Sequence, residues 1–314
     1  MVRGQNGEFP ISCNLQPKAQ NPHVSRLPYH VNCIQPWSVV SRPWSELLPS
    51  AIPSTFTPMT TSYLIDIEGT LITDGKALSG SVEFIGKLAE NKTPFLLITN
   101  TTTQPPEQIF SGLLKLGFQI SENQILSPVS VAVSYLKAKK YKSCKLVISE
   151  TLQSDFFEWS IKSEHKDAVV IGDIGNAWTY DLMNDCFGYL KSGAELIALH
   201  KGRFWQQNGN LQLDIGAFVA GLEYASGKTA TVMGKPSKTF FEIAVAKLDS
   251  KPENTIMIGD DLISDIGGAQ SAGLKTILVK TGKFREDHLK NSVVRPDSVA
   301  ESLSDIDTAS PSLL

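Results

Sequence analysis

Two carboxylates stand two residues apart at the end of an apolar run. Asp66 and Glu68 lie within the segment LIDIEGT, residues 64–70. Alternation along a β-strand sends residues i and i+2 to the same side, so both carboxylates can serve one site if the strand ends near them. Their mutual repulsion is costly unless a cation or a shared proton relieves it. The pair therefore predicts metal-assisted chemistry.

Three further segments end apolar runs with polar residues that suit phosphate or metal chemistry. They carry Thr99 and Asn100 in ITNT (98–101), Lys235 in MGKP (233–236), and Asp260, Asp261 and Asp265 in and after MIGDD (257–261). A single residue of this kind is more often a solvated loop residue than a ligand. In open α/β sheets, however, ligands bind beyond the carboxyl ends of the strands. Four such segments of complementary charge therefore predict one polar site.

Strand and helix patterns alternate from Ser62 onward, which predicts an α/β fold with a mostly parallel sheet. Strands are expected at 63–67, 94–99, 255–258 and 275–279, and helices at 81–90, 105–116, 129–139, 238–246 and 264–271. Ser79 is expected to cap the first of these helices, and Gly117 to end the second. Asp74-Gly75 has the composition of a tight turn.

A second set of patterns lies inside the first. Strands are expected at 145–148, 168–171 and 196–199, a helix at 180–191, and a hairpin that turns at Asn208-Gly209. A helix at 217–224 and a strand at 229–233 are expected to resume the first set. The sequence thus predicts a Rossmann-like core, residues 59–141 and 214–305, interrupted by an inserted α/β cap domain, residues 142–213, with a tail at 306–314.

The composition of the chain indicates which partners and which cellular compartment to expect. The chain has 314 residues, a formal charge of −3 and a pI near 6.0, which argues against a nucleic-acid partner recruited by bulk charge. No apolar run reaches the ~20 residues that span a bilayer, and the N-terminus lacks the apolar core of a secretory signal. Cys13, Cys33, Cys144 and Cys186 show no metal-ligand spacing, so reduced thiols are expected. A cytoplasmic protein without a membrane partner is the expectation.

Residues 1–58 differ in composition from the rest. They hold nine of the 17 prolines, and Glu8 and Glu46 are their only acidic residues. No helical or strand period is sustained there, so disorder is expected. Two explanations stay open. Met59 is the translation start and the segment is a gene-model extension, or the segment is a transit peptide, which its acid-poor composition favours and its prolines disfavour.

The order and the residue types of the polar segments resemble the motifs of the haloacid dehalogenase-like hydrolase superfamily. The resemblance rests on Ile98-Thr99-Asn100-Thr101-Thr102, Gly234-Lys235-Pro236 and Ile258-Gly259-Asp260-Asp261, and it covers about Thr61 to Ser304. Within the superfamily the chain is similar to the subfamily IIA phosphatases, which carry a type 2 cap. It looks closest to the branch of haloacid dehalogenase-like hydrolase domain-containing proteins and phospholysine phosphohistidine inorganic pyrophosphate phosphatases.

The resemblance implies a Mg²⁺-dependent phosphatase that forms an aspartyl-phosphate on a small phosphorylated substrate. Asp66 would be the nucleophile. It would also bind Mg²⁺, together with Asp260 and the backbone carbonyl of Glu68. Such a sparse shell of oxygen ligands suits an ion that keeps several waters.

The same resemblance implies roles for the remaining polar residues. Thr99 and the backbone around Asn100 would hold phosphoryl oxygens, and Lys235 would neutralise the charge that develops during transfer. Asp265 would orient metal waters or the lysine from outside the first ligand shell. For Asp261 two roles stay open, this outer shell or a solvated helix start, where a carboxylate is favourable.

Glu68 departs from the pattern of the family, whose phosphatases commonly carry an aspartate there as general acid and base. The extra methylene moves the carboxyl by roughly one bond length, and about 1 Å of misplacement can cost on the order of 100-fold in rate. Retained acid–base function is the favoured interpretation. The alternative is a side chain that points elsewhere and slow turnover.

The inserted segment would close over the substrate. Its basic and aromatic stretch 199–205 could suit an anion, but a solvated basic face and a structural His200 are the simpler interpretation. Two other functions stay open: a weak or inactive relative that binds a phospho-ligand or a protein, suggested by Glu68, and a carbon–halogen hydrolase, disfavoured by the three distal aspartates. A homodimer is compatible with the family.

Overall fold

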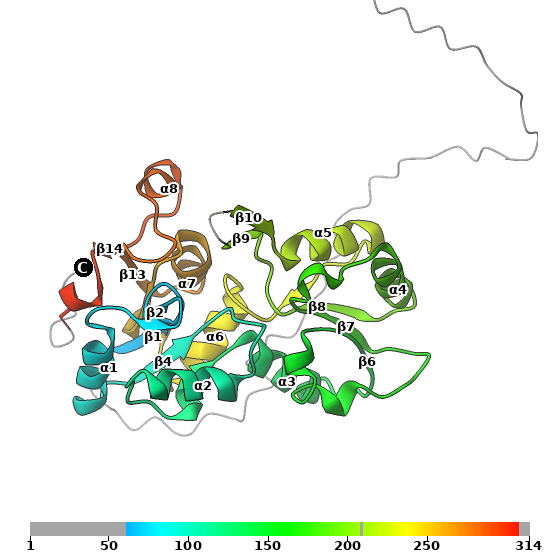
Figure 1. The fold of residues 1–314 in the computed structure, drawn as a ribbon, viewed down its shortest axis with the longest axis horizontal. Coiled ribbons are helices and arrows are strands. Elements are labelled where there is room, and N and C mark those ends of the chain that lie inside the picture. The colour runs from blue at the N-terminus through cyan, green and yellow to red at the C-terminus, as the bar shows by residue number, and fades with distance from the viewer. Residues whose placement is uncertain (1–60, 208–209, 308–314) are drawn as a thin grey trace, which may run out of the picture. The chain divides into compact units, whose positions relative to one another are not determined.

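A computed structural model of the chain describes residues 61–207 and 210–307 (Figure 1). The expectations about residues 1–58, Met59 and the Asn208-Gly209 turn lie outside these ranges. The expectation about the tail falls mostly outside them. Among the described residues, no helix combines the length and the apolarity needed to cross a membrane.

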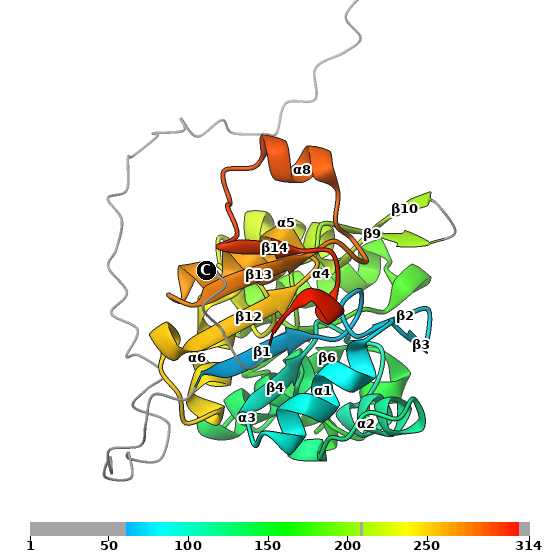
Figure 2. The same cartoon turned by 90° about the vertical axis from the view of Figure 1, so that its left-hand side faces the viewer.

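The first sheet has six parallel strands in the order β14-β13-β12-β1-β4-β5. Their bounds are β1 Ser62–Asp66, β4 Phe95–Ile98, β5 Ile125–Leu126, β12 Thr255–Gly259, β13 Lys275–Val279 and β14 Ser298–Ala300. Figure 2 shows β14, β13, β12, β1 and β4 side by side in this order. Along the chain, β1, β4 and β5 follow one another toward one edge of the sheet. The later strands β12, β13 and β14 follow one another from β1 toward the other edge. The boundary between β1 and β12 is therefore the switch point, where such sheets bind ligands.

Helices cover both faces of this sheet, because successive strand residues point to opposite faces. Leu64 and Met257 face one apolar cluster, which includes residues of α3 (Pro128–Ala138), α6 (Lys238–Lys247) and α7 (Gly268–Ser271). Ile65 and Ile258 face the other cluster, which includes residues of α1 (Ser81–Glu90) and α2 (Pro106–Lys115). A strand that is buried on both faces has a continuous run of apolar residues. For this reason β1 and β4 could be predicted from the sequence.

The second sheet has four parallel strands in the order β11-β8-β7-β6. Their bounds are β6 Cys144–Val147, β7 Ala168–Ile171, β8 Glu195–Ala198 and β11 Thr231–Val232. Helices α4 (Tyr180–Lys191) and α5 (Ile215–Ser226) contribute to the apolar cluster that packs on it. The antiparallel hairpin β9–β10, Phe204–Gln207 and Asn210–Leu213, lies between β8 and α5 in the chain.

The predicted α/β fold with a mostly parallel sheet is confirmed, and so are the helices 81–90 and 180–191 and the strands 168–171 and 275–279. The helix at 217–224 and the strand at 229–233 were expected to resume the core, and that prediction is wrong for both. The helix is α5, which packs with the second sheet. The strand at 229–233 pairs outside the first sheet as well. It forms β11, which pairs with β8 in the second sheet. A two-residue strand carries no signal for its neighbour. We therefore propose that the cap runs through β11, beyond the expected boundary at residue 213.

Two local predictions need correction, and a third, the turn at Asp74-Gly75, is confirmed. Ser79 does not cap α1; Gly80 occupies that position with φ 78°, and the cap has no side-chain hydrogen bond. Residues 264–271 form a π-helical turn, Leu262–Gly267, followed by the short α7. The turn at Asp74-Gly75 joins a small hairpin that the sequence did not reveal, β2 Ile72–Thr73 and β3 Lys76–Ala77. The helix α8, Glu286–Asn291, was also missed.

Candidate active site

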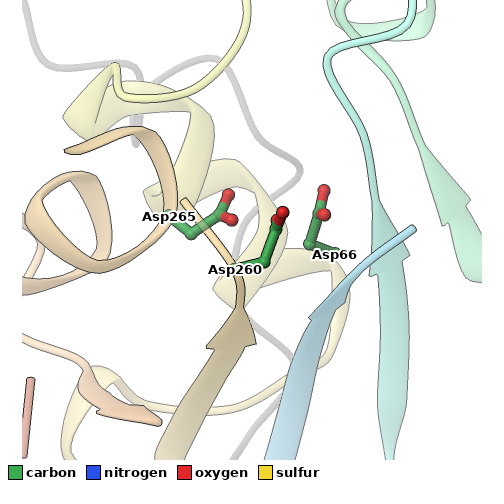
Figure 3. Close-up of side chains that lie close together, drawn as sticks. All are labelled: Asp66, Asp260 and Asp265. Carbon is green, nitrogen blue, oxygen red and sulfur yellow. The ribbon is translucent and has the colours of Figure 1, made fainter. Parts of the chain in front are cut away.

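Three carboxylates converge at the switch point of the first sheet. Asp66 ends β1, Asp260 follows β12, and Asp265 lies in the π-helical turn after it. All three are buried, and one oxygen atom from each lies within 4.8 Å of the others. Figure 3 shows their carboxyl groups gathered beyond the ends of the two strands. The sequence predicted that these residues share one site, and the structure brings them together.

Lys235 lies between two of these carboxylates. Its Nζ atom is 2.5 Å from Oδ1 of Asp66 and 2.6 Å from Oδ1 of Asp265, and its side chain is buried. Burial lowers the pKa of a lysine, but the charges of Asp265 and Asp66 outweigh that effect and raise the pKa above its usual value. The ammonium group is therefore a fixed positive charge beside Asp66.

Both oxygens of Asp265 are held by the protein. One accepts a hydrogen bond from the Lys235 ammonium, and the other accepts one from the Asp261 backbone N–H at 3.1 Å. Burial raises the pKa of Asp265 to about 7, against the lowering effect of Lys235 and with the help of Asp66. These contacts support the predicted outer-shell role, in which Asp265 orients the lysine.

Asp260 fits closely against two backbone positions where only glycine leaves enough room. A Cβ atom on Gly69 or on Gly282 would lie 2.1 Å from Oδ2 of Asp260, and the two glycines have φ of 89° and 49°. The Lys283 backbone N–H donates a hydrogen bond of 2.6 Å to the same oxygen. Burial, followed by the charges of Asp66 and Asp265, raises the pKa of Asp260 to about 8. The carboxyl is held rigidly beside two others that repel it.

The donor set of this cluster fits a hard divalent cation. Three buried carboxylates face one buried lysine, so the site carries excess negative charge when all three are ionised. Burial first, and then the neighbouring carboxylates, raise the pKa values of Asp260 and Asp265. Oxygen ligands with few protein contacts are what Mg²⁺ prefers. Asp66 and Asp260 are the side chains that would hold the ion. Both oxygens of Asp265 are committed to Lys235 and to the Asp261 N–H, whereas Oδ2 of Asp66 has only a long hydrogen bond of 3.4 Å from the Thr70 hydroxyl.

The segment after β4 lies on the other side of Asp66 in the sheet. The Thr99 hydroxyl is buried, accepts a hydrogen bond from the Thr101 N–H at 3.0 Å and donates one to the Thr101 hydroxyl at 2.9 Å. The Asn100 side chain, in contrast, is committed to Lys235: its amide donates to the Lys235 carbonyl and accepts from the Lys235 N–H. Phosphate binding was predicted for the backbone around Asn100, and the side chain of this residue holds the Lys235 backbone.

Glu68 is exposed. Partial desolvation raises the pKa of its carboxyl, the charges of Asp66 and Asp74 raise it further, and Lys283 opposes them. Within the described residues no hydrogen bond or ion pair holds this side chain. The carboxyl is therefore free to reach a leaving group but is not fixed in place to do so.

Asp261 caps the helical turn that follows it. Its Oδ1 accepts hydrogen bonds of 3.0 Å from the N–H groups of Ile263 and Ser264, and its Oδ2 lies 3.3 Å from the Lys283 ammonium. Burial raises the pKa of this carboxyl, but Lys283 and the two N–H groups together lower it below its usual value. Of its two open roles, these contacts favour the helix start, where the carboxylate is half-buried and caps the turn.

Sequence reasoning missed Lys283 and the residues before it. The segment Thr281-Gly282-Lys283 follows β13, and the Thr281 hydroxyl donates to the Gly69 carbonyl at 2.5 Å. Desolvation by burial lowers the pKa of Lys283. The charges of Asp261 and the other site aspartates outweigh the desolvation and raise the pKa above its usual value. The rule that drew attention to the other strand ends also applies to KTGK at 280–283. That signal was present in the sequence.

The basic stretch of the inserted domain is structural. Nδ1 of His200 accepts the Gly202 N–H at 3.1 Å, and burial lowers the pKa of this histidine, so its ring is neutral. Lys201 is 2.5 Å from Glu223. These contacts agree with a structural His200, whereas Lys201 is half-buried and ion-paired and so does not lie on a solvated basic face.

Comparisons with known proteins agree with this architecture. A family model described as haloacid dehalogenase-like hydrolase matches residues 63–162, and one described as HAD-hydrolase-like matches residues 232–306. The Bos taurus haloacid dehalogenase-like hydrolase domain-containing protein 2 is 40% identical over 224 residues, which cover 71% of this chain and 85% of that protein. The Homo sapiens phospholysine phosphohistidine inorganic pyrophosphate phosphatase is 34% identical over 248 residues, 77% of this chain and 91% of that protein.

Solved structures of the same architecture cover nearly the same part of the chain. NagD from Escherichia coli K-12 superposes with a TM-score of 0.71 at 25% identity, over 79% of this chain and 99% of that one. A thermostable NPPase double mutant from Geobacillus stearothermophilus gives 0.71 at 27% identity, over 80% of this chain and all of that one. With the aspartates and the lysine gathered at the switch point, these similarities show that the chain belongs to the haloacid dehalogenase-like hydrolase family.

Proposed function

We propose that this protein is a Mg²⁺-dependent phosphatase that acts through an aspartyl-phosphate on a small phosphorylated substrate. The observation that carries the proposal is Lys235, whose buried ammonium contacts Asp66 and Asp265 while Asp260 lies alongside. A phosphoryl group is negatively charged and repels a free carboxylate. The positive charge of Lys235, together with a cation held by Asp260, would offset this repulsion and let Asp66 approach phosphorus. Relatives and structural neighbours named as phosphatases support the same class.

In the proposed reaction, Asp66 attacks phosphorus with one carboxylate oxygen. The bond between phosphorus and the leaving oxygen breaks, and an acyl phosphate forms on Asp66. The ion pair with Asp265 holds the Lys235 ammonium in place, so that its positive charge stays next to the attacking carboxylate of Asp66. Thr99 and the backbone around Asn100 would hold the transferred oxygens. When bound, Mg²⁺ would supply further positive charge for those oxygens.

Glu68 is the proposed proton donor and acceptor. Its raised pKa favours the protonated carboxyl, which can give its proton to the leaving oxygen. The resulting carboxylate can then take a proton from the water that attacks the phosphorus of the acyl phosphate. Phosphate leaves, and Asp66 and Glu68 return to their starting states.

A second candidate function has one observation in its favour. Glu68 is exposed and no described residue holds it in place, so the general acid of this site is poorly positioned. A relative that binds a phospho-ligand and turns it over slowly would show this feature. The intact arrangement of Asp66, Lys235 and Asp260 favours the enzyme.

Hydrolysis of p-nitrophenyl phosphate, followed by a panel of phosphometabolites, tests the proposal in the presence and absence of Mg²⁺. We expect turnover by the wild type with Mg²⁺, and loss of it in Asp66→Asn and after chelation. Equal rates for wild type and Asp66→Asn would overturn the proposal. The same panel would name the substrate, and sedimentation would test the homodimer. A cytoplasmic location is a further part of the proposal.

A further inference from the structure

One carboxylate outside the active site gathers three hydroxyl groups. Oε1 of Glu195 accepts hydrogen bonds from the Tyr135 hydroxyl at 2.5 Å and from the Thr231 hydroxyl at 2.6 Å. Oε2 accepts one from the Tyr141 hydroxyl at 2.6 Å. Hydrogen bonds from hydroxyls to a carboxylate at these distances are strong and directional.

The four residues come from both parts of the fold and from both connections between them. Tyr135 lies in α3, which packs on the first sheet, and Tyr141 lies in the connection from α3 to β6. Glu195 begins β8 and Thr231 begins β11, so both lie at the amino ends of strands in the second sheet. One carboxylate therefore joins the core to both segments through which the chain enters and leaves the cap.

The hydroxyls are permanent donors. Burial, followed by Glu195 itself, raises the pKa of Tyr135 and of Tyr141 well above the usual range, so neither phenol ionises under ordinary conditions. Tyr135 is buried in the apolar cluster, and Tyr141 packs against it. Water competes less with these bonds than with fully exposed ones, because Tyr135 is buried and the other three residues are half-buried.

The return connection leads directly to the lysine of the active site. Thr231 precedes Lys235 by four residues, and Met233 between them donates its N–H to the Ala198 carbonyl of β8 at 2.9 Å. At the far end of this connection, Asn100 binds both backbone groups of Lys235. The lysine-bearing segment is thus tied at the cap end through Glu195 and at the core end through Asn100.

The carboxyl ends of the second sheet are held differently. Thr151, just after β6, donates its hydroxyl to the Thr103 carbonyl at 2.7 Å, and this contact is exposed to water. Exposed contacts of this kind open at little cost. Apolar contacts hold these ends as well, because Ile148 after β6 and Leu199 after β8 are buried in the same cluster as Leu64 of β1. The amino ends differ in being joined to the core by a partly buried polar network.

We propose that Glu195 is a positioning residue that forms the pivot of the cap. It fixes the orientation of the cap on the core by tying the amino ends of β8 and β11 to α3, and it keeps the Lys235 segment in register with both parts. The pivot itself does not depend on the identity of the reaction; its catalytic consequence rests on the proposed phosphatase activity.

Distance measurements between spin labels test the pivot without any assay of activity. Labels at Glu90→Cys in α1 and Lys191→Cys in α4 report on the core and the cap, since both positions are exposed helix ends. Cys13 and Cys33 are replaced by serine, and Cys144 and Cys186 are buried. We expect Tyr135→Phe and Glu195→Gln to broaden the distance distribution about twofold, because the cap samples more orientations.

A matched control separates the pivot from the general loss of a phenol. Tyr189→Phe in α4 removes a half-buried tyrosine hydroxyl of the cap, and its distribution should match that of the wild type. Thermal unfolding confirms that each variant is folded. Unchanged widths in both Tyr135→Phe and Glu195→Gln would overturn the pivot.

The catalytic consequence has its own measurement. For p-nitrophenyl phosphate we expect kcat/KM to fall about fivefold or more in Tyr135→Phe and Glu195→Gln, mainly through kcat, because Lys235 loses its register. A broadened distribution with unchanged kcat/KM would refute the positioning role. If the wild type itself hydrolyses nothing, the proposed function fails, and the distance measurement still decides on the pivot.

Discussion

Asn100 and Lys235 are joined by a reciprocal pair of hydrogen bonds. The Asn100 amide donates to the Lys235 carbonyl at 2.9 Å and accepts from the Lys235 N–H at 2.8 Å. The residues are 135 positions apart in the chain. This pair fixes the backbone from which the lysine reaches Asp66, so one side chain after β4 sets the position of the cation.

Replacing Asn100 should therefore impair catalysis more than folding. In Asn100→Ala the Lys235 backbone loses both partners, and we expect kcat to fall by about 10- to 100-fold, as for a misplacement near 1 Å. Asn184→Ala, at an exposed position of α4, serves as the control. Steady-state kinetics with p-nitrophenyl phosphate measures the effect, and an Asn100→Ala enzyme with unchanged kcat would contradict it.

Gly282 offers a sharp test of how Asp260 is held. A Cβ atom there would lie 2.1 Å from Oδ2 of Asp260, so Gly282→Ala must displace the carboxyl, and we expect Mg²⁺ affinity to fall at least about 10-fold. Gly75→Ala is the matched control, because that glycine also has a positive φ, 70°, but its Cβ would meet nothing within 4 Å. Titration calorimetry measures both. Equal losses would trace the effect to backbone strain instead of the contact.

The metal-free protein should lose stability as the pH rises. The folded-state pKa values of Asp260 and Asp265 are raised to about 8 and about 7, above the value of 3.8 for a free carboxyl. A carboxyl whose pKa is raised by folding binds its proton more tightly in the folded state. Its stabilising effect is thus complete below the unfolded pKa and is lost as the pH rises through the folded pKa. The window runs from about pH 4 to about pH 8.

Chemical denaturation in a chelator, from pH 5 to pH 9, measures this slope. Each group can contribute up to about 1.4 kcal/mol per pH unit within the window. Added Mg²⁺ should stabilise the protein most at the high end, where the carboxylates are ionised and free to bind it. Stability that rises with pH between 5 and 8 in the chelator would show that the cluster does not repel as described.

Shortening Glu68 tests whether the site is built around a glutamate. In Glu68→Asp the carboxyl retreats by roughly one bond length, which can change the rate by up to about 100-fold in either direction. Because neither side-chain contact nor burial fixes Glu68, we expect Glu68→Asp to raise kcat by bringing the acid to the position that is usual in the family. Pre-steady-state kinetics separates the two proton transfers, and a fall in kcat would mean that the longer side chain is required.

The sequence predicted most residues of the site because parallel strands end at one edge of a sheet. Asp66, Thr99 and Asp260 follow apolar strands that are buried on both faces, and such strands are the strongest signal a chain carries. The fold followed from the same alternation. The misplaced β11 shows the limit: a strand of two residues has no periodicity from which its partner could be read.

Side-chain partners across long separations could not be predicted. Nothing near Asn100 in the chain indicates that its amide binds the backbone at Lys235, and nothing near Glu195 indicates that two tyrosines and a threonine meet there. Those contacts depend on how two sheets pack, which a single sequence does not encode locally. Lys283 is different, because it stands beyond a predicted strand end and could have been found by the same rule as the others.

The proposed mechanism requires a phosphoryl group bound to Asp66 during turnover. The direct measurement is mass spectrometry of protein quenched in acid during turnover of p-nitrophenyl phosphate with Mg²⁺. We predict an added mass of about 80 Da on the peptide that carries Asp66, removed by hydroxylamine, as expected for an acyl phosphate. It should be missing in Asp66→Asn. Turnover without this adduct, or the same adduct in Asp66→Asn, would contradict the proposed mechanism.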